Sequence, residues 1–359
     1  MSTTASAAER RAWVEIDLGA VVANARAIAR ATGARLLPVV KANAYGVGAV
    51  AVCRALEAAD PWGYAVATAA EGAELRGAGL ARPIVVLTPA APTDFAELRA
   101  HALRPVFDDA AAARAWGSDG PFHVEIDTGM GRSGIRWDAV GDARAVLDSP
   151  QLEGVFTQLH SADLADATAD AQLERFQRSL AALPRRPALC HVANSAAALR
   201  DRRYAFDMVR PGIYLYGGAP GPGLAAGQPV VALRARVVSL RRLPAGETVS
   251  YGARWKAPRA TTIATLAIGY ADGPRRALGL TGGAYALLAG RRCAIAGVVT
   301  MDFTMVDVGD APARIGDVAT LLGTADGETI TLEQFAAWSG ELQHAVLTSL
   351  GGRPPRVYR

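Results

Sequence analysis

Short apolar runs alternate with alanine-rich stretches from residue 36 to residue 217, and this alternation constrains the fold most strongly. The runs have the length of buried strands, and the stretches between them show helical spacing, as at Leu173, Phe176 and Leu180. We predict strands at residues 36–40, 64–67, 84–87, 104–107, 122–127, 155–160, 189–192 and 213–216. Alternating strand and helix units of this number predict an α/β fold with an N-terminal (β/α)8 TIM-like barrel, whose site lies at the carboxyl ends of the strands.

The chain changes character after the last of these runs. Residues 217–229 are too rich in glycine and proline for a regular element and predict a linker. From residue 230 to residue 318, β-like runs separated by turns predict a C-terminal mostly-β domain, and two short helices at 332–338 and 341–350 close it. We therefore place the barrel domain at residues 1–225 and the β domain at residues 226–359.

Composition excludes several functional classes. The net charge of +4 and the pI near 9.1 favour anionic ligands weakly, but the arginines form scattered pairs without interleaved aromatic residues, so we expect no nucleic-acid partner. No apolar run approaches the roughly 20 residues of a membrane span, and the N-terminus lacks an apolar signal core, which predicts a cytoplasmic protein. The histidines occur singly and the three cysteines are far apart, so we expect reduced thiols and no metal site.

Lys41 is the first candidate for chemistry. Only it and Lys256 are lysines, although lysine and arginine together number 38. An amine can lose its proton near neutral pH and attack a carbonyl, whereas a guanidinium stays charged. Lys41 follows the apolar run at 36–40 and precedes a glycine-containing loop, at the strand end where α/β folds bind ligands. By position alone, a lysine that only extends its stem along the apolar strand end is an equal alternative.

The segment VVKANAYGVGA around Lys41 resembles the pyridoxal-phosphate lysine motif of bacterial alanine racemases, the fold type III enzymes. DTGMGR at residues 127–132 and GYADG at residues 269–273 resemble two further strings of that family. The resemblance implies pyridoxal 5'-phosphate on Lys41 and a racemase that interconverts L-alanine and D-alanine, which supplies D-alanine for peptidoglycan or catabolises it. It also implies a homodimer with composite active sites, and residues 11–18 joining the β domain.

The resemblance assigns cofactor-binding roles along the barrel. Tyr45, Ser195, Gly212 and Ile213 match phosphate-binding positions, although Ser195 taken alone indicates a plain helix N-cap. Arg210 matches the residue that faces the pyridine nitrogen, where an arginine would keep that nitrogen unprotonated. Arg132 matches the residue that orients the phenolic oxygen of the cofactor and the carboxylate of the substrate. His191 and Asn194 flank these positions and are expected to support them.

Inversion of a stereocentre requires a proton to leave one face of a carbon and another to arrive on the opposite face, so two bases are expected. Lys41 would serve one face, and Tyr251 resembles the tyrosine base of the family, contributed by the partner subunit. A phenol with a solution pKa near ~10 needs stabilisation as phenolate, for which His160 is the matching partner. The resemblance further places Met301 at the substrate carboxylate, Tyr270 near the entrance, and Asp302 beside them.

The chain departs from the family pattern in two places. Val298 and Thr300 stand where members commonly carry arginine and cysteine or serine, and Gly352 stands where many carry a tyrosine that narrows the site. Tyr358 is a candidate to replace that tyrosine. The gap at Gly352 favours a racemase of broader specificity, acting on serine or larger side chains, as an alternative. A non-catalytic pyridoxal-phosphate-binding barrel and a barrel decarboxylase are further alternatives, and the DTGMGR and Tyr251 matches argue against them.

Overall fold

The computed structural model describes residues 10–164, 166–280 and 282–359, and its chain divides into two compact units. The first unit is Gly19–Gln228. The second joins the segment that ends at Leu18 to Pro229–Arg359.

A closed ring of parallel strands forms the centre of the unit Gly19–Gln228. Six strands pair in the order β3-β4-β5-β6-β8-β9, and β2 pairs with β10. The bridges Val39–Ala65 and Asn194–Arg210 join β2 to β3 and β9 to β10, which closes the ring and confirms the predicted barrel. Its strands are β2 (Arg35–Leu36), β3 (Tyr64–Val66), β4 (Ile84–Pro89), β5 (Arg104–Phe107), β6 (Phe122–Asp127), β8 (Leu152–Phe156), β9 (Leu189–His191) and β10 (Met208–Val209).

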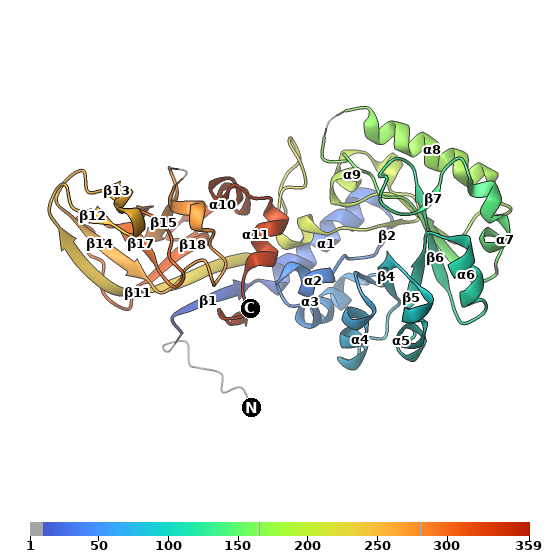
Figure 1. Cartoon of the computed structure of the whole chain (residues 1–359), viewed down its shortest axis with the longest axis horizontal. Helices are drawn as coiled ribbons and strands as arrows, with labels where there is room; N and C mark the ends of the chain where they lie inside the picture. The colour runs from blue at the N-terminus through green and yellow to red at the C-terminus, as the bar shows by residue number, and fades with distance from the viewer. Residues whose placement is uncertain (1–9, 165, 281) are drawn as a thin grey trace. The chain divides into compact units, whose positions relative to one another are not determined.

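Helices cover the outside of this ring (Figure 1). They bury one apolar face each, as α8 does with Leu173 and Phe176, because their other face meets water. The helices are α1 (Leu18–Thr32), α3 (Ala49–Leu56), α4 (Ala69–Gly77), α5 (Phe95–Ala100), α6 (Ala110–Trp116), α7 (Arg144–Leu147), α8 (Thr168–Ala182) and α9 (Ser195–Arg200). The short strand β7 (Ile135–Arg136) pairs in parallel with β6.

The predicted strand at residues 213–216 is wrong. Those residues form the 3-10 helix η5 (Ile213–Tyr216), and the eighth strand is β10, which the sequence-based prediction missed. Leu215 and Tyr216 are buried, and an apolar run of four residues does not distinguish a strand from a buried helical turn. The sixth strand also lies earlier than predicted, since β8 ends at Phe156 and leaves residues 157–160 in a loop.

The second unit is built on an antiparallel sheet that closes on itself. Its order is β19-β18-β15-β16-β17-β14-β11-β1-β20, and β18 also pairs with β11. The N-terminal strand β1 lies antiparallel to β11 and parallel to β20. The strands are β1 (Ala12–Ile16), β11 (Val231–Leu243), β14 (Thr261–Leu266), β15 (Tyr285–Leu288), β16 (Arg291–Ile295), β17 (Thr304–Asp307), β18 (Val318–Ala325), β19 (Glu328–Ile330) and β20 (Arg356–Tyr358).

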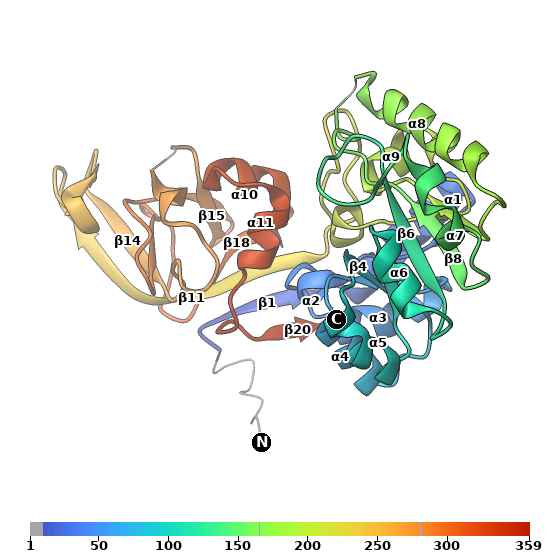
Figure 2. The same ribbon diagram turned by 45° about the vertical axis from the view of Figure 1, so that its right-hand side comes forward.

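Two loops of this second unit carry predicted site residues. The hairpin β12 (Thr248–Val249) and β13 (Trp255–Lys256) is joined through Tyr251. The run CAIAGVVTMDFTMVDV, one β-like run in the sequence, is two strands, β16 and β17, with Met301 in the loop between them. Helices α10 (Leu332–Ser339) and α11 (Gln343–Ser349) follow, with α10 against β18 (Figure 2).

All three cysteines, Cys53, Cys190 and Cys293, are buried free thiols. Burial raises the pKa of Cys190 and of Cys293 to about 11, so little thiolate exists at neutral pH. The described part of the chain holds no group of three or more histidine, cysteine, aspartate or glutamate side chains placed to bind a metal ion. Among the same residues, no helix combines the length and the apolarity that crossing a membrane requires.

Candidate active site

Polar side chains occupy the inside of the barrel, where branched apolar residues usually pack. His123, Thr157 and His191 are fully buried, and Glu125 and Arg210 are only 3% and 4% exposed. Burying such groups is unfavourable unless they are paired, so their presence here indicates a site rather than a packing core. The residues that the sequence analysis singled out in this unit surround them.

Lys41 opens a left-handed turn at the carboxyl end of the first barrel strand. Ala42, Asn43, Ala44 and Tyr45 have φ angles of 52°, 53°, 52° and 56°. A left-handed conformation costs an L-residue roughly 1–2 kcal/mol, and four successive residues of this kind persist only where the surroundings hold them. Nothing in the sequence signals this turn, because alanine favours right-handed helices.

Two side-chain contacts hold the turn. The Ala42 N–H donates to Glu71 Oε1 at 2.7 Å, and the Ala49 N–H donates to Asn43 Oδ1 at 2.8 Å. Glu71 Oε2 also accepts from the Ala67 N–H at 2.7 Å and from the Thr68 N–H at 3.3 Å, and the second of these bonds belongs to the capping box that starts α4. The sequence analysis missed Glu71, whose only local signal is the Thr68-to-Glu71 spacing of a helix start.

The Lys41 amine is tuned toward its neutral form. Burial lowers its pKa, and the positive charges of Arg132 and Arg210 lower it further, while Glu71 opposes the shift. A lowered pKa increases the fraction of neutral amine at physiological pH, and the neutral amine is the nucleophile. The electrostatics therefore favour the predicted role of Lys41 over that of a lysine that only snorkels.

The residues predicted to bind phosphate come together beside this turn. The Gly212 N–H donates to Ser195 Oγ at 2.8 Å, and a Cβ added at Gly212 would lie 2.5 Å from Tyr45 Oη. Ile213 opens η5 immediately afterwards. Burial raises the pKa of Tyr45 to about 12, which keeps its hydroxyl as a donor, and its ring lies 4.8 Å from that of Tyr216.

Ser195 is not the helix cap that its position alone indicated. Asn194 caps α9, its Oδ1 accepting from the Ala197 N–H at 3.1 Å. Asn194 thus supports the loop as predicted, and the hydroxyl of Ser195 turns across to Gly212 instead. Both residue types cap helices well, so the sequence alone does not say which of two neighbours caps the helix.

Arg210 is held by a full set of barrel acceptors. Nη1 donates to His191 Nδ1 and to the His191 carbonyl, each at 2.9 Å, and Nη2 donates to the Thr157 carbonyl at 2.8 Å. Among the described residues, Nε has no hydrogen-bond partner, which leaves one N–H for a ligand. Burial lowers the pKa of Arg210 to about 10, so the guanidinium remains cationic at neutral pH.

Arg132 lies in the loop formed by DTGMGR. Its Nη2 is 3.8 Å from Glu125 Oε1, and the Ser133 hydroxyl donates to Glu125 Oε2 at 2.7 Å. The Arg132 side chain is 59% exposed, whereas that of Glu125 is 4% exposed. The buried Glu125 carboxylate therefore pairs with an exposed guanidinium and helps to orient it. The sequence analysis missed Glu125, which resembles any inward residue of a barrel strand.

His160, the predicted partner of the tyrosine base, lies in the loop after β8. Its Nδ1 is 2.6 Å from Ser161 Oγ, and its backbone N–H donates to Gln172 Oε1 at 2.9 Å. The imidazole is exposed. Its pairing with Tyr251 stays a prediction.

The predicted site residues of the second unit are exposed and gather on neighbouring loops. Tyr251, Tyr270 and Met301 are 69%, 42% and 53% exposed. The Tyr270 N–H donates to the Thr300 carbonyl at 2.9 Å, which places Tyr270 beside the Met301 loop. Asp302 accepts from Arg353 Nη1 at 2.9 Å, and the same guanidinium holds Asp272 through Nε at 2.7 Å.

The departures from the family pattern have different surroundings. A Cβ added at Gly352 would meet nothing within 4 Å, so the space for a larger side chain is open. Val298 is buried, and its carbonyl accepts from the Ser250 hydroxyl at 2.6 Å, next to Tyr251. Tyr358 lies on β20, which pairs with β1.

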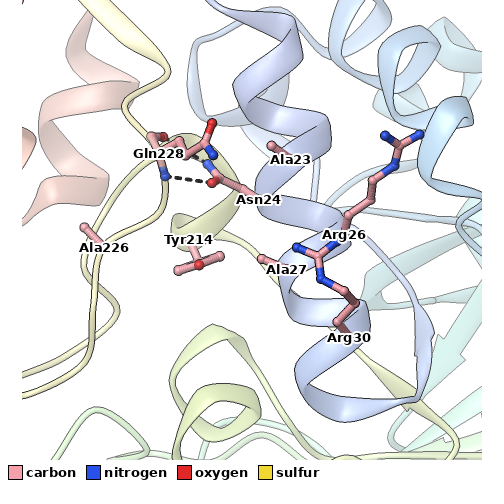
Figure 3. A pocket seen from close by; sticks show the side chains of 8 residues that line it. All are labelled: Ala23, Asn24, Arg26, Ala27, Arg30, Tyr214, Ala226 and Gln228. Carbon is pink, nitrogen blue, oxygen red and sulfur yellow. Dashed lines mark hydrogen bonds between the residues drawn. The ribbon is translucent and has the colours of Figure 1, made fainter.

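A cavity of about 340 Å³ lies elsewhere on the barrel unit, between α1 and the segment that contains Ala226 and Gln228 (Figure 3). The side-chain amide of Asn24, at its edge, already has partners. It donates to the carbonyls of Leu215 and Gln228 and accepts from the Gln228 N–H. None of the predicted site residues lines this cavity. We therefore assign the chemistry to the polar barrel interior.

The barrel site fits pyridoxal phosphate in the chemistry of its side chains. The free Arg210 Nε matches an unprotonated ring nitrogen, which can only accept. The hydroxyls of Tyr45 and Ser195 lie together beside Gly212, where they match the oxygens of a phosphate as hydrogen-bond donors. The Lys41 amine matches an aldehyde carbon, so each functional group of the cofactor has a counterpart.

Comparisons with known proteins assign the chain to a family. A family model for the N-terminal domain of alanine racemase matches residues 16–220, and one for the C-terminal domain matches residues 230–358. The alanine racemase of Symbiobacterium thermophilum is 40% identical over 370 residues, which cover 97% of both chains. The solved structure of the alanine racemase of E. faecalis superposes with a TM-score of 0.91, at 31% identity over 98% of each chain.

Two further solved structures bear on cofactor and substrate. Alanine racemase from Bartonella henselae with covalently bound pyridoxal phosphate has a TM-score of 0.88, at 29% identity, over 97% of this chain and 99% of that one. A histidine racemase from Leuconostoc mesenteroides also has a TM-score of 0.88, at 27% identity over 98% of each chain. With both domain models matched and a relative aligned over nearly its whole length, the chain belongs to the alanine racemase family.

Proposed function

We propose that this protein is an alanine racemase that uses pyridoxal 5'-phosphate to interconvert L-alanine and D-alanine. The observation that carries the proposal is Lys41, a lysine at the carboxyl end of a barrel strand. Its pKa is lowered by burial, Arg132 and Arg210. The family membership of the whole chain points to the same activity.

The barrel residues would hold the cofactor at three points. Lys41 Nζ takes the aldehyde carbon, Arg210 Nε faces the ring nitrogen, and Tyr45, Ser195, Gly212 and Ile213 surround the phosphate. When bound, pyridoxal phosphate supplies a conjugated ring that delocalises the electron pair left behind as the α-proton departs. Arg210 carries no proton that it can give up at neutral pH, so the ring nitrogen beside it stays unprotonated. An unprotonated nitrogen withdraws fewer electrons, which limits the delocalisation and suppresses side reactions.

Proton transfer would be shared between two residues. Lys41 Nζ accepts or returns the α-proton on one face of the substrate, and Tyr251 Oη does so on the other. His160 would stabilise the phenolate of Tyr251. Arg132, anchored by Glu125, and the Met301 N–H would bind the substrate carboxylate, which keeps the α-carbon between the two bases.

The active site would be composite, formed from two copies of the chain in a homodimer. The exposure of Tyr251, Tyr270 and Met301 supports this arrangement, because large side chains with functional roles are seldom left uncovered in the working protein. We place the enzyme in the cytoplasm, where it would supply D-alanine for peptidoglycan.

A direct test is to incubate the purified protein with L-alanine in D2O and to follow the optical signal and the α-proton by NMR. We expect equal amounts of both enantiomers at equilibrium and deuterium at the α-carbon, because each proton is exchanged at a base. Carbon dioxide release without D-alanine would instead indicate a decarboxylase. A protein that shows cofactor absorbance but turns over no amino acid would indicate a binding protein.

A second candidate function is a racemase of broader specificity. The open space at Gly352 supports it, as does the histidine racemase among the structural relatives. Rates on alanine, serine, lysine and histidine would distinguish the two. If alanine is preferred only weakly, Gly352→Tyr should raise the preference for alanine over serine by about tenfold, since pocket contacts of this size are worth about that much.

A further inference from the structure

Arg210 is the first member of a line of side chains that crosses the inside of the barrel, all buried except the last, Glu153, whose side chain is 23% exposed. Its Nη1 is 2.9 Å from His191 Nδ1, His191 Nε2 is 3.0 Å from His123 Nδ1, and His123 Nε2 is 3.3 Å from Glu153 Oε2. These four residues come from β10's end, β9, β6 and β8. We call His191, His123 and Glu153 the relay.

The order of donors and acceptors in the relay has a single solution. A guanidinium can only donate, so His191 Nδ1 must accept and the proton of His191 lies on Nε2. His123 Nδ1 then accepts, and the proton of His123 lies on Nε2, which donates to the Glu153 carboxylate. The two histidines are therefore both neutral Nε2–H tautomers, between a cation at one end and an anion at the other.

The barrel is shaped to admit the relay. Gly154 pairs with His123 across β6 and β8, and a Cβ there would lie 2.5 Å from His123 Nδ1. Only glycine at this position leaves room for the imidazole to reach His191. The His191 ring also stacks on Phe156 at 4.8 Å and 15°, and Arg210 lies 5.0 Å over the same Phe156 ring.

The charges agree with this assignment. Burial lowers the pKa of His123 and, together with Arg210, that of His191, so both rings stay neutral at physiological pH. Burial alone would raise the pKa of Glu153, but the hydrogen bond from His123 and the charge of Arg104 at 3.4 Å outweigh it and keep the carboxylate ionised.

We propose that His123 and Glu153, at a position made possible by Gly154, are positioning residues for Arg210. They act through His191, whose tautomer they set. The proposal rests on the proposed function, in which Arg210 faces the ring nitrogen of the cofactor. With the relay intact, His191 accepts from Arg210 and holds the guanidinium plane. With the relay broken, His191 can move its proton to Nδ1, where it repels Arg210.

The first test reads the tautomers directly and needs no turnover. Imidazole 15N shifts of the full-length holoenzyme, assigned with His123→Asn and His191→Asn variants, should show a protonated Nε2 and an unprotonated Nδ1 in both rings. They should remain so between about pH 6 and pH 9, because both groups are buried. An Nδ1–H tautomer or a cationic ring at either position would overturn the proposal.

The second test breaks the relay at its least buried member. Glu153→Leu should redistribute the His191 tautomer, shift the visible absorbance of the bound cofactor, and raise the share of turnovers lost to transamination. Racemisation should fall by about tenfold to hundredfold, as expected for a lost hydrogen bond to a charged group. Glu153→Gln, whose amide oxygen can still accept from His123 Nε2, should keep the wild-type absorbance spectrum and the wild-type ratio of racemisation to transamination.

Two controls separate the relay from general stability. Glu57 pairs with Arg82 at 2.7 Å outside the relay, so Glu57→Leu removes a similar Glu–Arg pair and should leave spectrum and ratio unchanged. Gly154→Ala perturbs His123 without removing a charge and should act like Glu153→Leu. If Glu153→Leu and Gly154→Ala fold and match the wild type in spectrum and ratio, the positioning role is refuted.

The outcome remains distinguishable from failure of the proposed function. If the protein does not racemise alanine, the proposed function fails, while the 15N shifts and the cofactor absorbance still decide the tautomers and their effect on Arg210. If alanine is racemised but the shifts show the other tautomer, only the relay proposal fails.

Discussion

The barrel interior and the exposed loops of the β domain prepare their functional residues in different ways. Arg210 is 4% exposed and is held by five contacts with barrel groups, whereas Tyr251 is 69% exposed. A side chain that is already held loses little conformational freedom when a ligand arrives. The Arg210 side can therefore bind the cofactor without help from the substrate. An exposed tyrosine acquires a defined position only when another surface covers it. The comparison teaches that cofactor binding is built into one chain, while the proposed second base depends on a partner.

The largest expected effect comes from removing the amine of Lys41. Lys41→Ala should abolish the visible absorbance of the bound cofactor and lower racemisation by at least about 10⁴-fold, because the tether and one proton carrier are lost together. Absorbance of the purified protein and polarimetry would measure the two effects. Lys256→Ala, at the only other lysine, should change neither. Retained absorbance in Lys41→Ala would show that the cofactor is held elsewhere.

The next largest effect is expected at Tyr251, the exposed tyrosine of the β domain. Tyr251→Phe should keep the cofactor absorbance and lower racemisation by about 10²–10⁴-fold, the usual contribution of one general acid or base. Tyr285→Phe is the matched control, since Tyr285 packs on Trp338 with ring centroids 4.9 Å apart, away from the predicted site loops. Normal turnover by Tyr251→Phe would remove the two-base assignment.

A mixture of the two inactive variants sharpens this prediction. If Lys41 and Tyr251 of different chains form one site, dissociating and reassociating Lys41→Ala with Tyr251→Phe should restore about a quarter of the wild-type activity, because half of the dimers are mixed and each has one intact site. No recovery in a mixture that has exchanged subunits would place both bases on the same chain.

A smaller effect is expected at the phosphate cradle. In Gly212→Ala the new Cβ would lie 2.5 Å from Tyr45 Oη, so the turn or the ring must move. Overpacking of this kind costs about 1–3 kcal/mol, which predicts cofactor binding weaker by about tenfold to hundredfold. Titration of the apoprotein with pyridoxal phosphate would measure the affinity. Gly77→Ala, where a Cβ meets nothing within 4 Å, should bind normally.

The smallest effect is a shift in pH dependence. Burial, Arg132 and Arg210 lower the pKa of Lys41, so uptake of pyridoxal phosphate by the apoprotein should rise with pH and level off below the pKa of free lysine. Arg132→Gln removes one positive neighbour, which should raise the pKa and move the inflection to higher pH. Arg136→Gln, at a residue of β7 that pairs with Asp138, should leave the inflection in place. An unchanged inflection in Arg132→Gln would exclude this charge coupling.

Much of the fold could be predicted because its signals are local. Strands buried on both faces appear as continuous apolar runs, which is why seven of the eight barrel strands were recognised at or near their places. The eighth was misplaced because β10 has only Met208 and Val209, while the longer apolar run after it folds into η5. The run around Met301 is β-like throughout in the sequence, because Val298 and Val299 are as apolar as strand residues, although they lie in a loop.

The candidate site also has residues that local sequence signals reveal and residues that they do not. Lys41, Arg210 and Tyr251 were predicted from their residue types and the strings around them, because reactive groups of this kind are rare enough to be noticed. Glu71, Glu125, His123 and Glu153 were missed. Glu71, His123 and Glu153 act through contacts with residues distant in sequence, as when His123 meets His191 68 positions later, and no spacing rule covers such a pair. Glu125 was missed although Arg132 and Ser133 are near in sequence, because it resembles any inward residue of a strand.

The order of residues alone specifies the alternation that makes a barrel, the switch to a β domain after the linker, and a lysine at a strand end. Only the tertiary structure decided that Ala42 to Tyr45 would turn left-handed, that Asn194 and not Ser195 would cap α9, and that a line of histidines would stand behind Arg210. The reason is physical. Local propensity selects the elements, but a strained turn or a buried polar chain is stable only where groups from other strands arrive to satisfy it.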